Sequence, residues 1–497
     1  MRLDQMTSSR RGHQGRQLPG FMTDPYVIVS AALVVWGLVI STHHIWGGDW
    51  QAHVASVRAL VDDPWHPENP QVGGVTPWPY FEPYELALAF AARFTGLSAA
   101  TVFELAGPVN AVLLLWALRR FCRSLGGGRW TPVLALVFTL FLWGVQAVGW
   151  SGILALGSLL ACWSYPATFA TALALLLLDG LLRFRSGPVA PWLGLLCLLS
   201  ALLVLVNAAT ALGAAASAAG LVLGGHSRWR PWRLAALSAP AAAGLVALLC
   251  WPYFGLATLL GRGEGFDEVQ AQLLDHPLGF YGFALLGLPA LWRDRRRPLG
   301  WELIGVFAVC VVVIAAGMAV GSTARLIPFP VLALHLALAR HLAVQAGRLG
   351  AYRKVIAVAT VVGACVTSGS AVLRALPPDL RLGRYQDVGT HFLFVLRYLR
   401  PGDVLLTADL AAARSLSVHG VRSVAPGYEH FFVPDEERRL LAVRRFMDAR
   451  TSVWERDRIA GEYRARCVLT TSPPAVPLPG FTLREAASDD LALYCRR

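Results

Sequence analysis

Hydrophobic residues along this chain form long runs that are separated by short polar connections. Runs such as 25–45, 301–320 and 355–372 approach the ~20 residues that a helix needs to cross the hydrocarbon core of a bilayer. Because backbone groups in lipid must be hydrogen-bonded within the segment, each run is predicted to be an α-helix. The pattern therefore predicts a polytopic α-helical membrane protein.

Counted along the chain, the runs predict about eleven transmembrane helices. Residues 153–162, between two of these runs, are either a short interfacial or re-entrant helix or part of a span. The predicted spans cover residues 26–46, 99–118, 131–148, 164–182, 190–206, 208–224, 234–253, 278–292, 300–319, 326–343 and 354–373.

The hydrophobic pattern changes after about residue 376, where the runs become short. Residues 403–407 and 467–470 read as buried strands, and 434–449 and 452–464 read as charged, amphipathic helices. This order predicts a small α/β domain that is long enough to have its own core. The chain then divides into a tail (1–25), a multi-span domain (26–375) with a first outer loop (47–98), and an α/β domain (376–497).

Composition agrees with a membrane protein, because 55% of the residues are hydrophobic and 15% are charged. An ordinary soluble domain carries roughly 25% charged residues. The net charge of +13 comes from short clusters between runs rather than from a contiguous basic stripe, so we expect no nucleic-acid partner. The first apolar run is long and lacks a small-residue cleavage site, which favours a retained span over a signal peptide.

Charge also predicts the orientation in the cell membrane. Arginines cluster in the N-terminal tail and in alternate connections, which places that side in the cytoplasm. The other connections are acidic, and an odd number of spans puts the C-terminal domain outside the cytoplasm. Cys467 and Cys495 are the two cysteines of that domain, and the sequence leaves open whether they pair.

The first outer loop concentrates the polar side chains that could carry chemistry. Asp49 follows the first span at once and precedes a predicted helix over 50–61, in which His53 shares its face one turn later. A second helix is predicted over 84–94, with Glu82 just before it. Asp49 is either a helix cap at the membrane boundary or a functional carboxylate, and the surrounding features favour function.

This layout resembles the GT-C superfamily of membrane glycosyltransferases, which take sugars from polyprenyl-phosphate-linked donors. Asp49 matches the acidic catalytic residue that follows their first span, and the two loop helices match theirs. Residues 321–325 (GSTAR) look like a place where such enzymes hold lipid phosphate, and the C-terminal domain is similar to their outer domains. The paired-acid motif common in the superfamily is absent, since Gly48 and Trp50 flank Asp49.

The resemblance implies transfer of a sugar from a polyprenyl-phosphate-linked donor to a cell-envelope glycan, glycolipid or protein on the extracytoplasmic face. Asp49 would act as general base, with His53 orienting it or binding phosphate. Arg325 is the first candidate for binding the leaving phosphate, and Arg58 is the second. Glu82 could supply a second carboxylate or a metal ligand. No ligand spacing assigns a metal, so a divalent cation stays an open alternative.

The sequence leaves two other functions open. A polytopic transporter or lipid flippase would act without covalent chemistry, but the spans contain few charged residues, chiefly Glu104, Asp179 and Glu302. A membrane scaffold would only present the C-terminal domain. Tyr428, Glu429 and His430 follow Pro426-Gly427 in a predicted loop that could contact an acceptor, although an ordinary surface loop is the favoured interpretation.

Overall fold

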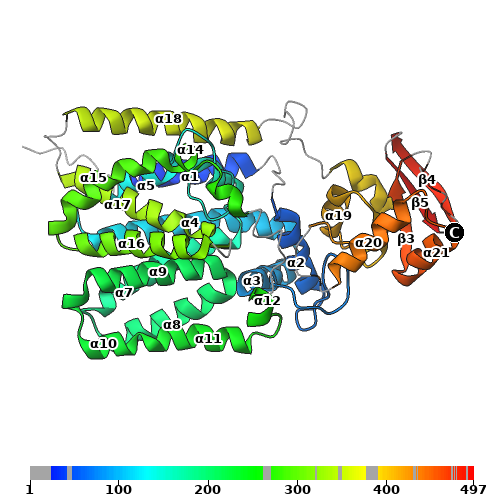
Figure 1. The fold of residues 1–497 in the computed structure, drawn as a ribbon, viewed down its shortest axis with the longest axis horizontal. Coiled ribbons are helices and arrows are strands. Elements are labelled where there is room, and N and C mark those ends of the chain that lie inside the picture. The colour runs from blue at the N-terminus through cyan, green and yellow to red at the C-terminus, as the bar shows by residue number, and fades with distance from the viewer. Residues whose placement is uncertain are drawn as a thin grey trace, which may run out of the picture.

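Figure 1 shows a bundle of roughly parallel helices and, beyond one end of it, a smaller domain that contains a sheet. Gly321, Glu429, His430 and nearly all of the predicted tail lie outside the residues that the structure describes. The structure, a computed structural model, describes residues 24–41, 48–260, 270–318, 322–344, 350–375, 390–428, 433, 435–471, 474, 476, 478, 480–488 and 491–496.

Seven helical segments among the described residues are long and apolar enough to cross a membrane, so the chain is a multi-pass membrane protein. Three shorter apolar helices accompany them: α1 (Pro25–Ser41), α5 (Thr131–Phe141) and α9 (Ala208–Gly224). The seven are α4 (Ala99–Leu125), α7 (Pro166–Phe184), α8 (Val189–Val206), α10 with α11 (Pro231–Ala236 and Ser238–Cys250), α16 (Gly300–Gly317), η6 with α17 (Ser322–Leu326 and Pro328–Val344) and α18 (Gly350–Ala375).

The predicted count of eleven spans is not confirmed. Residues 278–292 do not form one helix but divide into α14 (Pro277–Tyr281), the 3-10 helix η3 (Gly282–Gly287) and α15 (Leu288–Arg293). Glycine is a poor helix former, and Gly287 packs so closely that a Cβ there would lie 2.6 Å from the Leu334 carbonyl oxygen. The segment 153–162 contains the short helix α6 (Leu156–Ala161).

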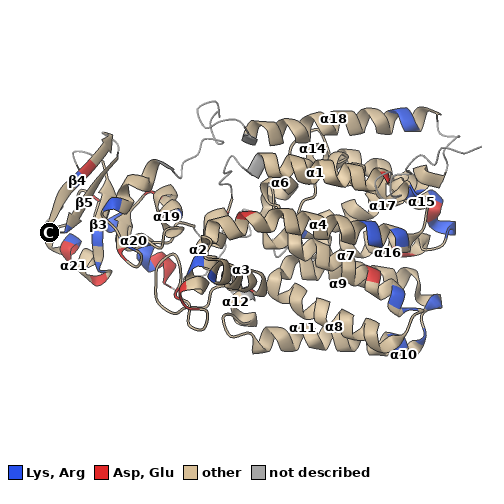
Figure 2. Ribbon diagram, turned by 180° about the vertical axis from the view of Figure 1, so that it is seen from behind, with Lys and Arg blue, Asp and Glu red and all other residues tan. Residues whose placement is uncertain are grey.

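Basic side chains gather at the end of the bundle that lies away from the C-terminal domain (Figure 2). Two buried carboxylates are paired there. Asp179 accepts from Arg120 at 2.5 Å and from Arg183 at 2.9 Å, and Glu302 accepts from Arg228 at 2.7 Å. Two of the three charges noted in the predicted spans therefore hold arginines at the basic end.

The two helices predicted in the first outer loop are confirmed as α2 (Trp50–Asp62) and α3 (Pro83–Thr95). Pro83 begins α3, where the missing N–H costs no hydrogen bond, and Gly96 ends it with a left-handed φ of 71°. Every residue of α2 from Trp50 to Val57 is buried, because the helix lies between the bundle and the C-terminal domain.

The C-terminal domain is a five-stranded sheet with strand order β2-β1-β3-β5-β4. The predicted strands and helices are confirmed by β1 (Val404–Thr407), β3 (Ala465–Thr470), α20 (Glu436–Met447) and α21 (Val453–Glu462). β1 pairs in parallel with β2 and β3, whereas β5 runs antiparallel to β3 and β4. The elements not predicted are η9 (Thr390–Arg397), α19 (Leu410–Ser417), β2 (Arg422–Ser423), β4 (Phe481–Ser488) and β5 (Leu491–Arg496).

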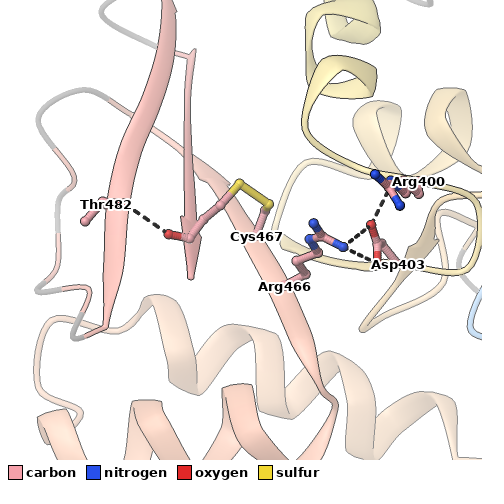
Figure 3. Close-up of a disulfide and its surroundings, with 6 residues drawn as sticks. Arg400, Asp403, Arg466, Cys467 and Thr482 are labelled. Atoms are coloured by element: carbon pink, nitrogen blue, oxygen red, sulfur yellow. Dashed lines mark hydrogen bonds and ion pairs between the residues drawn. A yellow bond between two sulfur atoms is a disulfide. The ribbon is translucent and has the colours of Figure 1, made fainter. Parts of the chain in front are cut away.

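The antiparallel register of β3 and β5 places Cys467 opposite Cys495, and the two form a disulfide (Figure 3). Beside it, Asp403 pairs with Arg466 at 3.0 Å and accepts the backbone N–H of Arg400 at 2.7 Å. These contacts tie together the start of β1, the adjacent strand β3 and the last strand of the chain.

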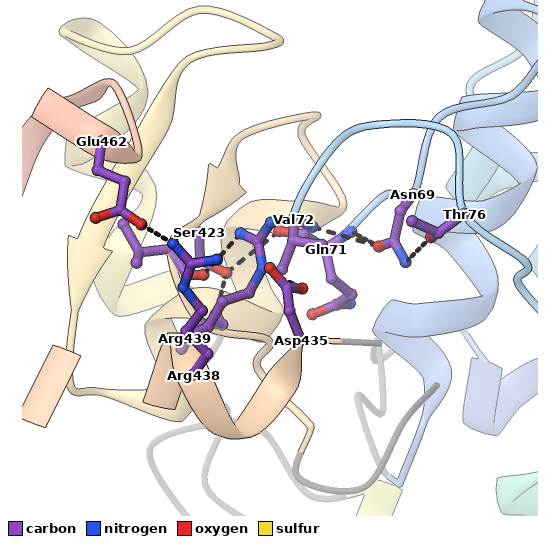
Figure 4. Close-up of polar contacts among 11 residues, drawn as sticks. Asn69, Gln71, Val72, Thr76, Ser423, Asp435, Arg438, Arg439 and Glu462 are labelled. Atoms are coloured by element: carbon purple, nitrogen blue, oxygen red, sulfur yellow. Dashed lines mark hydrogen bonds and ion pairs between the residues drawn. The ribbon is translucent and has the colours of Figure 1, made fainter. Parts of the chain in front are cut away.

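Buried hydrogen bonds join the C-terminal domain to the first outer loop around Gln71 (Figure 4). The main-chain carbonyl of Gln71 accepts from the Ser423 amide at 2.8 Å, and its side-chain oxygen accepts from the Gly427 amide at 3.0 Å. Asn69 closes the turn before it, accepting from the Gln71 amide at 2.9 Å and donating to Thr76 at 3.1 Å. The sheet domain is thus docked on the loop that carries Asp49.

Candidate active site

Asp49 lies at the turn that leads into α2. Gly48 makes this turn with a φ of 62°, a conformation that favours glycine. Asp49 occupies the N-cap position of α2, but its side chain makes no capping hydrogen bond. Its carboxylate instead accepts a hydrogen bond from the Tyr80 hydroxyl at 2.8 Å and lies 3.5 Å from Nε2 of His53. The geometry therefore does not favour the cap interpretation.

His53 bridges two carboxylates. One turn after Asp49, its Nδ1 atom lies 2.7 Å from Oε1 of Glu85 on α3. The ring is 4% exposed, and it stacks on Phe103 with centroids 5.5 Å apart. Tyr80 and Tyr165 meet it edge-on. Packing and hydrogen bonds therefore fix the orientation of the imidazole.

This bridge sets the charges of Asp49 and His53. Burial lowers the pKa of His53, but the Asp49 carboxylate and then Glu85 outweigh burial and raise that pKa to about 9. Burial likewise raises the pKa of Asp49, yet the His53 cation and the Tyr80 hydroxyl hold it at about 2. Both residues are therefore charged at neutral pH.

The pKa of Glu82 is shifted in the direction opposite to that of Asp49. Burial raises the pKa of Glu82 well above its usual range, and the neighbouring Glu85 carboxylate raises it further. Ligand atoms of His53, Glu82 and Glu85 lie within 4.8 Å of one another and could hold a metal ion. An imidazole with two carboxylates suits several divalent cations, which would compete with the proton that His53 shares with Glu85.

A cavity of about 120 Å³ opens in front of Asp49, and we call it the Asp49 cavity. Arg325, in η6, reaches it from the bundle; its guanidinium lies 5.9 Å from the centroid of the Trp150 ring. The positive charge of Arg325 also helps to lower the pKa of Asp49. The lining residues with polar side chains are Asp49, His53, Tyr80, Glu82, Ser151, Tyr165, Asn207 and Arg325.

Arg58 lies apart from the other predicted site residues. It donates to the Val418 carbonyl at 3.4 Å and lines a different cavity of about 360 Å³, together with Asp62 and Arg422. Five residues along an α-helix rotate a side chain by roughly 140° net, so Arg58 faces away from the side that carries His53. The structure thus brings Asp49, His53, Glu82 and Arg325 together and separates Arg58 from them.

The sequence did not indicate Tyr80 or Glu85 as site residues, and for Tyr428 it favoured an ordinary surface loop; all three contact the Asp49 turn or the His53 ring. Glu85 could have been found, because a carboxylate three residues after Glu82 shares its face of a helix. Tyr80 lies in an irregular segment whose shape no local pattern specifies. Tyr428 reaches the site only because the C-terminal domain docks there.

Comparison with known proteins places this arrangement in a structural class. No protein-family model matches the sequence, and no curated protein matches it either. The cryo-EM structure of the arabinofuranosyltransferase AftD from mycobacteria matches over 95% of this chain and 40% of its own, with 19% identity and a TM-score of 0.58. The chain therefore spans less than half the length of that protein.

A second match is the archaeal oligosaccharyltransferase AglB from Archaeoglobus fulgidus, solved in complex with an inhibitory peptide and a dolichol-phosphate. The similarity covers 90% of this chain and 69% of AglB, with 10% identity and a TM-score of 0.58. Both proteins are glycosyltransferases of the GT-C fold. The chain therefore has the GT-C fold of membrane glycosyltransferases.

Proposed function

We propose that the protein transfers a sugar from a polyprenyl-phosphate-linked donor to a cell-envelope acceptor on the extracytoplasmic face of the membrane. The observation that carries the proposal is that Asp49 and Arg325 line the same cavity. The reaction needs a base for the acceptor hydroxyl and a positive charge for the leaving phosphate. A carboxylate and a guanidinium can supply these two roles. The GT-C fold and the dolichol-phosphate in the AglB structure support this class of donor.

In this reaction an acceptor hydroxyl attacks the anomeric carbon while the bond between that carbon and the phosphate oxygen breaks. Asp49 accepts the hydroxyl proton, and Arg325 stabilises the negative charge on the departing polyprenyl phosphate. Glycosyl transfer passes through an oxocarbenium-like transition state. The attacking hydroxyl becomes strongly acidic as its new bond forms, so a carboxylate of low pKa suffices as base.

His53 and Glu85 hold the base in place. Because the imidazole lies between Asp49 and Glu85, the Asp49 carboxylate is kept facing the cavity. The docked C-terminal domain lies at the same end of the bundle, opposite the arginine-rich end (Figure 2). Positive-inside topology would place the arginines in the cytoplasm and the acceptor side outside it.

Asp49→Asn tests the proposal in purified, full-length protein. We expect turnover of a synthetic polyprenyl-phosphate-linked pentose or hexose to fall by roughly 10²–10⁴-fold, the usual contribution of a general base. Asp62→Asn, exposed at the end of the same helix, is the matched control and should keep wild-type turnover. A folded Asp49→Asn protein with normal turnover would exclude Asp49 as the base.

The same purified protein can be used to distinguish sugar transfer from transport of the lipid donor. Reconstituted liposomes would be assayed for movement of the lipid donor between leaflets and for covalent product. Movement without product would favour a flippase or transporter over a glycosyltransferase. Adding a chelator, then Mn²⁺ or Mg²⁺, would show whether His53, Glu82 and Glu85 use a cation.

A further inference from the structure

Tyr428 enters the neighbourhood of Asp49 from the far end of the chain. Its side chain is 6% exposed, and its hydroxyl donates to Oε1 of Gln51 at 2.9 Å. The same hydroxyl lies 3.3 Å from the main-chain carbonyl oxygen of Gly48. Gly48 precedes Asp49 directly, and Gln51 follows it by two residues, on the turn that starts α2. Tyr428 is therefore a buried part of this turn and not a residue of an ordinary surface loop.

Contacts with the C-terminal domain and with the first outer loop both hold Tyr428 in place. The Arg414 guanidinium lies 4.7 Å over the centroid of the Tyr428 ring, so the ring is packed from within its own domain. The preceding residue, Gly427, donates its amide to Gln71 of the first outer loop at 3.0 Å. Ring and backbone are thus both fixed relative to α2.

The N-cap residue of α2 does not cap the helix with its own side chain. The first amides of a helix have no partner within the helix, and a side chain at the N-cap usually accepts from them. Asp49 does not do so, and the Tyr428 hydroxyl instead holds this turn from outside, through the Gly48 carbonyl and the Gln51 side chain. The Asp49 carboxylate is consequently left to accept from Tyr80 and to pair with His53.

We propose that Tyr428 is a positioning residue: docking of the C-terminal domain places its hydroxyl against Gly48 and Gln51, and these two hydrogen bonds fix the turn that orients the Asp49 carboxylate. The inference rests on the proposed function, because it assigns Tyr428 an effect on the same base. It also gives the C-terminal domain a part in the chemistry, through a hydroxyl that does not touch the substrate.

Tyr428→Phe tests the assignment, since it removes the hydroxyl and keeps the ring over which Arg414 lies. We expect kcat to fall by roughly tenfold, the rate equivalent of one lost hydrogen bond. The KM for the lipid-linked donor should stay unchanged, because phosphate binding by Arg325 is not altered. Tyr463→Phe is the matched control: Arg439 lies 5.3 Å over that ring, and the substitution should leave kcat unchanged.

A double substitution separates positioning from general loosening. If the hydroxyl acts through Gln51, then Gln51→Ala added to Tyr428→Phe should lower kcat little further, whereas independent effects would multiply. An unchanged kcat in Tyr428→Phe, or a loss that follows only from a smaller folded fraction, would overturn the inference. Failure of the proposed function would look different, because the wild-type protein would then form no product.

Discussion

At the scale of single residues, the site is a line of four ionisable groups, of which all but Glu85 line the Asp49 cavity. Asp49 faces the cavity, His53 follows it, and Glu85 and Glu82 complete the line. The sequence predicted that Asp49 and His53 lie close together, because one helical turn separates them. It could not show that Glu85 closes the line, since that contact depends on how α3 packs against α2.

The pH dependence of stability should reveal this line. The pKa of His53 is raised from 6.5 to about 9, so its stabilisation is complete below pH 6.5 and is lost as the pH rises through 9. The pKa of Asp49 is lowered from 3.8 to about 2, so its stabilisation is complete above pH 3.8 and is lost as the pH falls through 2. The pair therefore stabilises the fold most between pH 4 and 6.5.

His53→Gln removes the cation and keeps a polar side chain. Near pH 6 we expect the variant to be less stable than the wild type by about 2–3 kcal/mol, and the difference should shrink steadily toward pH 9. Thermal unfolding in detergent between pH 5 and 9 measures it. His66→Gln, on an exposed residue of the same loop, serves as control. A difference that grew with pH would contradict a protonated His53.

At the scale of elements, the sequence predicted where the helices lie better than it predicted what they pack against. The apolar runs were predicted from their length and the two loop helices from their periodicity, and both are local properties of the sequence. The burial of α2 was not predicted, since it depends on a domain that follows more than 300 residues later in the chain. β4 was missed because most of its side chains are exposed, and β2 because two residues carry no pattern.

The buried carboxylates of the bundle offer a prediction at this scale. Asp179→Asn would leave Arg120 and Arg183 without their shared charged partner at the basic end. Arg120 and Arg183 are partly exposed and stay solvated, so the loss of their charged hydrogen bonds costs about 1–3 kcal/mol and lowers the unfolding temperature. Turnover per folded molecule at low temperature should stay normal, because Asp179 does not line the Asp49 cavity. A loss of turnover without a loss of stability would instead assign Asp179 to function.

At the scale of the whole molecule, the chain is polarised between an arginine-rich end and an end closed by the sheet domain (Figures 1 and 2). The hydrophobic runs and the arginine clusters were enough to predict a membrane protein with one basic side. They were not enough to predict that the C-terminal domain contacts the Asp49 turn, because nothing in the sequence specifies Gln51 as the partner of Tyr428 or Gln71 as the partner of Gly427. Domain docking and the geometry of Asp49 are therefore expected to change together.

Gln71→Ala tests this coupling at a distance from the base itself. The substitution removes the side-chain hydrogen bonds to Gly427 and Ser417 but keeps the main-chain contact with Ser423. We expect faster amide hydrogen exchange in β2 and in residues 423–428, together with a fall in kcat of roughly three- to tenfold at unchanged donor KM.

Arg397→Ala is the control, because it breaks an exposed ion pair with Glu485 inside the same domain. Surface pairs of this kind contribute little, so both exchange and kcat should match the wild type. If Gln71→Ala loosened the C-terminal domain while kcat stayed at its wild-type value, the domain would be anchored on the catalytic loop without acting on it. The coupling holds only if exchange and catalysis change in the same variant, because the hydroxyl of Tyr428 can bond to Gly48 and Gln51 only while its domain is docked.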